Sequence, residues 1–211
     1  MKKVPVAKGR PKSAQKRADI LKAAQRLFLE LGFEGTSMDA IAALAGVSKL
    51  TVYNHFTDKE RLFQDAVEQR CREQLPDDLF APLQGGDIER NLREIATRFQ
   101  ALMESADSIA LHRMMLGDAR NAQRLGELFW NAGPARIIAS LDAFLRAAVA
   151  RGDLQIEDTH EAAMQLLHLL KGESLACLLC GKVAGSRAGA SAHVDSVVRM
   201  FLRAYRPRAG G

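Results

Sequence analysis

The segment from Ala45 to Lys59, AGVSKLTVYNHFTDK, constrains the fold more than any other part of the chain. Gly46 supplies the backbone freedom that a tight turn between two helices requires. Ser48 can cap the helix that follows, because its hydroxyl can accept a hydrogen bond from an exposed backbone N–H. Val52 and Phe56 lie four residues apart and therefore face the same side, toward a core. The segment predicts a turn followed by a short helix with one buried face.

The opposite face of this short helix carries groups that point away from the core, namely Leu50, Thr51, Tyr53 and Asn54. A short, capped helix that displays such groups is suited to a DNA groove. The segment therefore looks like the second half of a helix-turn-helix.

The residues before it predict a first helix over about 14–31, with Ser13 as its cap. Gly32 and Gly35 are expected to end this helix and let the chain turn. Its apolar residues recur at helical spacing and are expected in a core: Ile20, Ala24, Leu27, Phe28 and Leu31.

Two further helices complete a small core over residues 14 to 67. Thr36 or Ser37 is expected to begin the second helix, and Asp58 to cap the fourth. The apolar residues expected to face inward are Ile41, Leu44 and Ala45 in the second helix and Leu62, Phe63 and Val67 in the fourth.

The stretch from Ala18 to Phe63 resembles the TetR/AcrR family of bacterial transcription regulators. The matching features are Gly32-Phe33, Thr36-Ser37, Ile41-Ala42, Ala45-Gly46-Val47-Ser48, Tyr53, Phe56 and Lys59-Glu60. The resemblance implies a sequence-specific DNA-binding regulator. Leu50 departs from the family, which usually has a small residue there; it could contact a thymine methyl or simply be exposed.

The resemblance and the residue chemistry together suggest which side chains touch DNA. Thr36 and Ser37 are expected at a helix N-terminus, where backbone N–H groups favour phosphate. Ser48 belongs to the same surface. Tyr53, His55 and Lys59 match family positions that contact the DNA backbone, and the base-reading candidates are Lys49, Leu50, Thr51 and Asn54. The alternatives are a packing role for Tyr53 and a plain surface position for His55.

Charge is concentrated near the same segment. The net charge is +5 overall, but residues 1–61 hold 12 Lys or Arg and 6 Asp or Glu. A basic excess beside a helix-turn-helix suits a polyanion partner, double-stranded DNA. Residues 1–13 are expected to form a flexible basic arm that follows phosphates or enters a minor groove; a tail with nonspecific contacts is the alternative. A basic N-terminus that only aids solubility is the alternative for the charge itself.

Composition favours an all-α fold. The chain has 211 residues, is 47% hydrophobic, and shows no convincing alternating apolar stretch. We expect residues 14–74 to form the DNA-binding domain and 75–211 a larger helical domain. Helices are expected at about 88–105, 107–119, 121–132, 134–151, 159–181 and 193–205, with Gly185 to Ala192 as a loop.

The stretch GELFWNAGPARIIASLDAFLRAAVARGDLQIEDTHEAAMQLLHLLKGE is similar to the C-terminal domain of AefR-like TetR regulators. The matching features are Ala132-Gly133-Pro134, Arg151-Gly152-Asp153-Leu154 and Leu170-Lys171-Gly172. This resemblance implies an effector-binding and dimerisation bundle that takes a small hydrophobic ligand. Pocket candidates are His112, Met115, Phe129, Trp130, Met164, His168 and Cys177, with ordinary core packing as the alternative for each.

A homodimer on a palindromic operator is expected, because one short helix reads few bases. By family similarity, the last two long helices form the dimer surface. Their apolar residues cover more than one narrow stripe: Leu166, Leu167, Leu169 and Leu170, and Val194, Val197, Val198, Phe201 and Leu202. A purely intramolecular core is the alternative.

Other function classes find less support. No nucleophile elbow, phosphate-binding glycine loop or metal signature indicates an enzyme, a cofactor or a metal site. The apolar stretch Ala162 to Cys180 is interrupted by His168, Lys171 and Glu173, and no signal-peptide segment is present, so a cytoplasmic protein is expected. Cys177 and Cys180 form a C-x-x-C within a predicted helix, which leaves redox sensing as a minor hypothesis. The leading interpretation is a ligand-released repressor; an activator or a nonspecific DNA-binding protein is the alternative.

Overall fold

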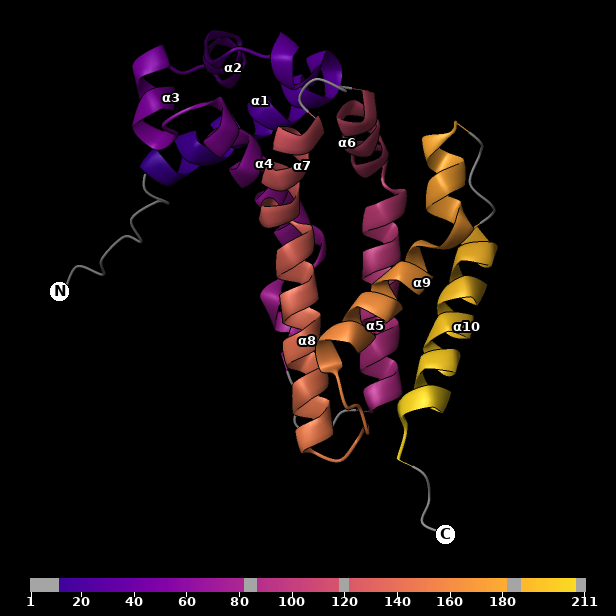
Figure 1. The fold of residues 1–211 in the computed structure, drawn as a ribbon. Coiled ribbons are helices and arrows are strands. Elements are labelled where there is room, and N and C mark those ends of the chain that lie inside the picture. The colour runs from indigo at the N-terminus through magenta and orange to yellow at the C-terminus, as the bar shows by residue number, and fades with distance from the viewer. Residues whose placement is uncertain (1–11, 82–86, 118–121, 182–186, 208–211) are drawn as a thin grey trace, which may run out of the picture. The chain divides into compact units, whose positions relative to one another are not determined.

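The computed structural model describes residues 12–81, 87–117, 122–181 and 187–207, and these residues form helices without a strand (Figure 1). The chain divides into two compact units, Met1–Val67 and Glu68–Gly211. The predicted all-α fold is therefore confirmed. The predicted domain boundary at residues 74/75 falls at the end of helix α4 (Lys59–Gln74).

The first unit holds α1 (Lys12–Gly35), α2 (Met38–Ala45), α3 (Lys49–His55) and the start of α4. The predicted cap at Ser13 is wrong, because Lys12 already belongs to the helix. Residues 1–11 of the expected arm lie outside the described residues, and Lys12 and Ser13 belong to α1 rather than to an arm. Three other predicted caps are confirmed: the side chains of Ser37, Ser48 and Asp58 accept hydrogen bonds from the backbone N–H groups of Ala40, Thr51 and Arg61, at 3.1, 3.2 and 2.7 Å.

Gly32 breaks α1, as the sequence predicts. Its φ of 74° and ψ of 174° lie in a backbone region that residues other than glycine rarely adopt. The break brings Phe33 back against Phe28, with ring centroids 5.7 Å apart, and both rings pack edge-on against Phe63 of α4 at 5.5 and 5.3 Å. This aromatic cluster joins both ends of the unit.

Most predicted core residues of the first unit are buried, Leu27 and Ala45 are half-buried, and two are exposed. Leu31 and Leu44 are 52% and 43% exposed. Each lies one or two residues before a glycine at which the chain turns away, so its neighbours cover it only in part. Helical spacing identifies the correct face and does not show where the cover ends.

Among its described residues, the second unit contains the end of α4, the short 3-10 helix η1 (Asp77–Phe80) and six later α-helices. These are α5 (Ile88–Glu104), α6 (Ala106–Gly117), α7 (Ala122–Ala132), α8 (Pro134–Ala150), α9 (Thr159–Leu179) and α10 (Arg187–Tyr205). Helix α9 is central, because it packs against α5, α6, α8 and α10 (Figure 1). Its buried side chains include Ala162, Leu166, Leu167 and Leu170.

Two predictions in this unit need correction. The predicted loop from Gly185 to Ala192 is helical from Arg187 onward. Between Arg187 and Ala192 the alanines favour a helix and outweigh the one glycine, Gly189. The predicted continuous helix over 159–181 is broken at Gly172, where φ is 48° and ψ is −158°. The Nε2–H of His193 in α10 donates to the carbonyl of Leu169 at 3.0 Å, satisfying a backbone group near the break.

A buried carboxylate ties α8 to α9. Asp142 is 5% exposed, accepts a hydrogen bond from the Thr159 hydroxyl at 2.6 Å, and is paired with Arg146. The bond from Arg146 lowers the pKa of Asp142, and the bond from Thr159 acts in the same direction. The start of α9 is thereby fixed against α8.

Candidate DNA-binding surface and ligand pocket

Helix α3 is held by its buried face and displays the opposite face to solvent. Val52 and Phe56 are 0% and 1% exposed, while Leu50 and Tyr53 are 70% and 44% exposed, and Asn54 is also exposed. Gly46 adopts the left-handed conformation at the end of α2 (φ 65°, ψ 32°), which makes the tight turn possible. The short helix therefore exposes both polar and apolar side chains on one face, while its opposite face is packed into the core of the unit.

An ion-pair cluster that the sequence prediction missed anchors this support. Asp65 of α4 is 8% exposed and pairs with Arg17 of α1 at 2.5 Å and with Arg61 at 3.0 Å. The Arg17 guanidinium also lies 5.2 Å from the centre of the Phe56 ring, just after α3. The four-residue spacing of Arg61 and Asp65 was visible in the sequence, but the approach of Arg17 across 48 positions was not.

Two DNA-contact candidates are held by neighbours on the same surface. The Lys49 ammonium lies 2.8 Å from a carboxylate oxygen of Asp39 in α2, and both side chains are exposed. The hydrogen bond from this pair raises the pKa of Lys49. The hydroxyls of Thr51 and Ser48 lie 2.8 Å apart, so both side chains are ordered by the cap of α3.

Thr36 does not face solvent, so it is not available for the phosphate contact that the sequence predicts. Its side chain is 2% exposed, and its hydroxyl lies within hydrogen-bonding distance of the carbonyls of Leu27 and Gly32, at 3.1 and 2.7 Å. Its backbone N–H donates to the carbonyl of Phe33 at 3.3 Å. Thr36 therefore closes the turn after α1, while the neighbouring Ser37 remains exposed.

Lys59 is similarly engaged within the unit. Its ammonium donates to the carbonyl of Phe33 at 2.8 Å and lies 4.4 Å from the centre of the Phe33 ring. Its side chain is 25% exposed. Lys59 thus stabilises the turn that follows the break in α1. His55 is half-buried and lies beside Phe56, with ring centroids 6.3 Å apart.

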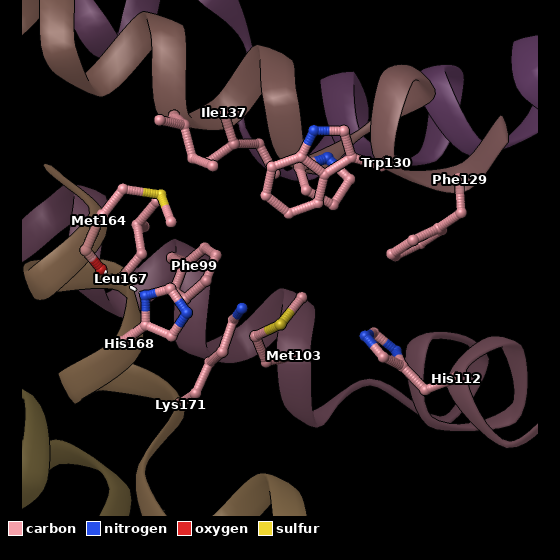
Figure 2. Close-up of a pocket in the computed structure, with 12 residues that line it drawn as sticks. Phe99, Met103, His112, Phe129, Trp130, Ile137, Met164, Leu167, His168 and Lys171 are labelled. Atoms are coloured by element: carbon pink, nitrogen blue, oxygen red, sulfur yellow. Dashed lines mark hydrogen bonds between the residues drawn. The ribbon is translucent and has the colours of Figure 1, made fainter. Parts of the chain in front are cut away.

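A cavity of about 120 Å³ lies within the second unit, lined from α5, α6, α7, α8 and α9 (Figure 2). Five predicted pocket residues line it: His112, Phe129, Trp130, Met164 and His168. Met115 does not line it, and the side chain of Cys177 lies outside the described residues. The prediction missed seven lining residues, which are Phe99, Met103, Pro134, Ile137, Ile138, Leu167 and Lys171.

Two histidines and one lysine, besides the indole N–H of Trp130, interrupt the apolar lining. The Nδ1 atoms of His112 and His168 each lie 2.7 Å from the carbonyl four residues earlier, on Ser108 and Met164. Because a carbonyl only accepts, the Nδ1 atoms of both rings carry a proton. Burial lowers the pKa of His112, and nearby Lys171 lowers it further. Burial also lowers the pKa of Lys171.

The two cysteines whose side chains are described differ in exposure. Cys71 is buried and Cys180 is exposed. Burial raises the pKa of the Cys71 thiol to about 11. Within residues 12–81, 87–117, 122–181 and 187–207, no cluster of three metal-binding side chains occurs and no helix is long and apolar enough to span a membrane.

Comparisons with known proteins agree with this geometry. Residues 20–66 match the bacterial regulatory proteins of the tetR family, and residues 90–207 match the C-terminal domain of AefR-like transcriptional repressors. Both descriptions concern transcription regulators rather than enzymes.

Individual relatives cover most of the chain. A Mesorhizobium loti protein assigned to the TetR regulators is 30% identical with a TM-score of 0.79, covering 94% of this chain and 100% of its own. The flavonoid-responsive regulator FrrA is 33% identical with a TM-score of 0.75, covering 93% and 100%. The uncharacterised HTH-type regulator YdeS of Bacillus subtilis is 25% identical over 163 residues, 76% of this chain and 78% of its own. The chain therefore belongs to the TetR family of DNA-binding transcription regulators and carries an AefR-like C-terminal domain.

Proposed function

We propose that the protein is a homodimeric, cytoplasmic repressor that leaves a palindromic operator when a small apolar ligand binds its second unit. The observation that carries this proposal is the exposed face of α3, held by a buried opposite face and by the Arg17–Asp65 pair. A rigid support of this kind lets a few side chains select bases without first becoming ordered. The match to AefR-like repressors supports repression over activation.

The DNA contacts divide into two groups by chemistry. Leu50 and Asn54 are exposed and project from α3, so a thymine methyl and an adenine edge are their suitable partners. Lys49 can contact guanine only by leaving Asp39. Thr51 can offer its methyl or hydroxyl to a base edge, and the groups suited to phosphate and sugar are Ser37, Ser48, Tyr53 and His55.

A dimer is needed because a single α3 spans only a few base pairs. Helices α9 and α10 are the proposed interface, and Leu169 and Met200 on them are 40% and 49% exposed. Burying these side chains against a second copy would remove apolar surface from water. Two α3 helices would then read two half-sites with twofold symmetry.

The cavity supports a ligand response. Its wall of aromatic and Met side chains suits an apolar molecule, and the similar protein FrrA is flavonoid-responsive. A ligand can cause release only if it binds the DNA-incompetent conformation more tightly. The proposal therefore requires that ligand affinity and operator affinity oppose each other in the same protein.

The test begins with selection of bound duplexes from a random pool at near-physiological salt. An inverted repeat recovered with two chains per duplex would support the proposal. Salt-sensitive binding without any motif would instead indicate nonspecific DNA association. The recovered duplex then serves as the probe for release by candidate ligands.

A further inference from the structure

The ligand cavity contains one cationic side chain without a matching anion. Lys171 projects from α9 just before the Gly172 break, and Figure 2 shows its ammonium directed into the space between His168 and Met103. None of the described residues that line the cavity is acidic. No carboxylate among the described residues pairs with Lys171, and burial alone shifts its pKa.

An ammonium in this position is costly unless something compensates it. Burial removes part of its hydration and disfavours its charged form. A methionine or leucine would fill the same space without that cost. The neighbouring imidazoles of His112 and His168 do not compensate either, because a histidine side chain, neutral or protonated, carries no negative charge.

A bound anion would supply the missing charge. An anionic oxygen at the ammonium gains a charge-assisted hydrogen bond, while an aromatic body lies against Phe99, Phe129 and Trp130. The cavity of about 120 Å³ is of the order that holds a single aromatic ring. Apart from His112, His168 and the indole N–H of Trp130, the remaining described lining is apolar, and it contains no second lysine or arginine.

We propose that this pocket selects acidic aromatic ligands, with a ring in the apolar part of the cavity and an anionic oxygen, carboxylate or phenolate, at Lys171. This assignment rests on the proposed effector function and names the chemical class of the effector. It also gives Lys171 a specificity role that is separate from the packing of α9.

Trp130 provides the readout. It lines the cavity and is the single tryptophan of the chain, so its fluorescence reports binding without any DNA present. The probes are 3-phenylpropanoate, its neutral amide, and pentafluorophenol, which is a phenolate at neutral pH. The full-length protein is titrated as wild type, Lys171→Met and Lys171→Arg, with Lys22→Met as a control that removes one exposed lysine from the first unit.

The informative quantity is the ratio of acid to amide affinity within each protein, because partial misfolding of a variant changes both affinities together. Lys171 is only partly buried, so we expect a wild-type preference of about tenfold for an acid, at the low end of charge-assisted hydrogen bonds. Lys171→Met should abolish this preference. Lys171→Arg should retain much of it, and Lys22→Met should leave it unchanged.

Each result decides the assignment. A Lys171-dependent preference for either acid supports the assignment. The preferred acid then shows whether the oxygen at Lys171 belongs to a carboxylate or to a phenolate. Equal binding of acid and amide, a preference that survives in Lys171→Met, or no binding of any probe at millimolar concentration would overturn it. Failure of the repressor proposal would appear separately, as absence of operator selection, and would leave the fluorescence result intact.

Discussion

Replacing Gly32 by alanine tests what determines the backbone turn in the first, DNA-binding unit. Gly32 has φ 74° and ψ 174°, and a Cβ placed there meets no atom within 4 Å. The substitution therefore adds no steric clash and changes only the backbone energy. A non-glycine residue in that backbone region destabilises the folded state by about 1–3 kcal/mol. Alanine also lowers the conformational entropy of the unfolded chain, which stabilises the folded state by about 0.4–1 kcal/mol. We expect Gly32→Ala to destabilise the first unit by about 1–2 kcal/mol.

Gly35→Ala is the matched control three residues later. Gly35 has no positive φ, and a Cβ there would lie 3.4 Å from the Cβ of Leu31, an ordinary contact. Alanine at this position should be neutral or stabilising by up to about 1 kcal/mol. The same chemical change should therefore have opposite effects at two nearby glycines.

Hydrogen–deuterium exchange of peptides from α1 to α4 measures this difference locally, because Trp130 reports only on the second unit. A loss of 1–2 kcal/mol corresponds to exchange about 5–30 times faster by opening of the unit. Unchanged exchange in Gly32→Ala, or equal effects of the two substitutions, would show that the break in α1 is not set by the glycine backbone.

Three further predictions concern charge and burial. Asp65→Ala leaves Arg17 without its partner and should weaken the first unit by about 1–3 kcal/mol, seen as faster exchange in α1; no change would make the pair energetically silent. Burial lowers the pKa of His112, so the unfolded imidazole takes up a proton first, and stability should fall as pH drops below about 6.5. Urea unfolding across that range should show a smaller fall in His112→Gln, and an identical pH dependence would contradict the assignment. Cys180 should react with a thiol reagent in the native protein, whereas buried Cys71, with its pKa raised to about 11, should react only after unfolding, as peptide mass mapping can determine.

The local parts of the fold were predictable because local chemistry determines them. Ser37, Ser48 and Asp58 cap helices through bonds to residues three positions away, which a sequence displays directly. The break at Gly32 is of the same kind. The break at Gly172 was missed, although the glycine was visible, because nothing within α9 shows that His193 of α10 packs against it.

The site was predictable only as residue types. Thr36 and Lys59 match positions of a DNA-binding family, but contacts with Leu27 and Phe33 engage them inside the unit. Met103 lines the cavity and Met115 does not, a distinction that depends on how the helices are arranged around it. Lys171 is visible in the sequence as a cation in an apolar helix, but the sequence alone does not show that its side chain enters the cavity.

Sequence-specific DNA recognition by the exposed face of α3 is tested most directly by one comparison of affinities. Wild type and Asn54→Ala are titrated with the selected duplex and with a scrambled duplex of equal length, at one fixed salt concentration. Wild type should prefer the selected duplex by at least about a thousandfold. Asn54→Ala should lose about 1–3 kcal/mol of binding to the selected duplex and little to the scrambled one. Equal wild-type affinity for both duplexes, or equal losses on both in the variant, would show that α3 does not read the base sequence.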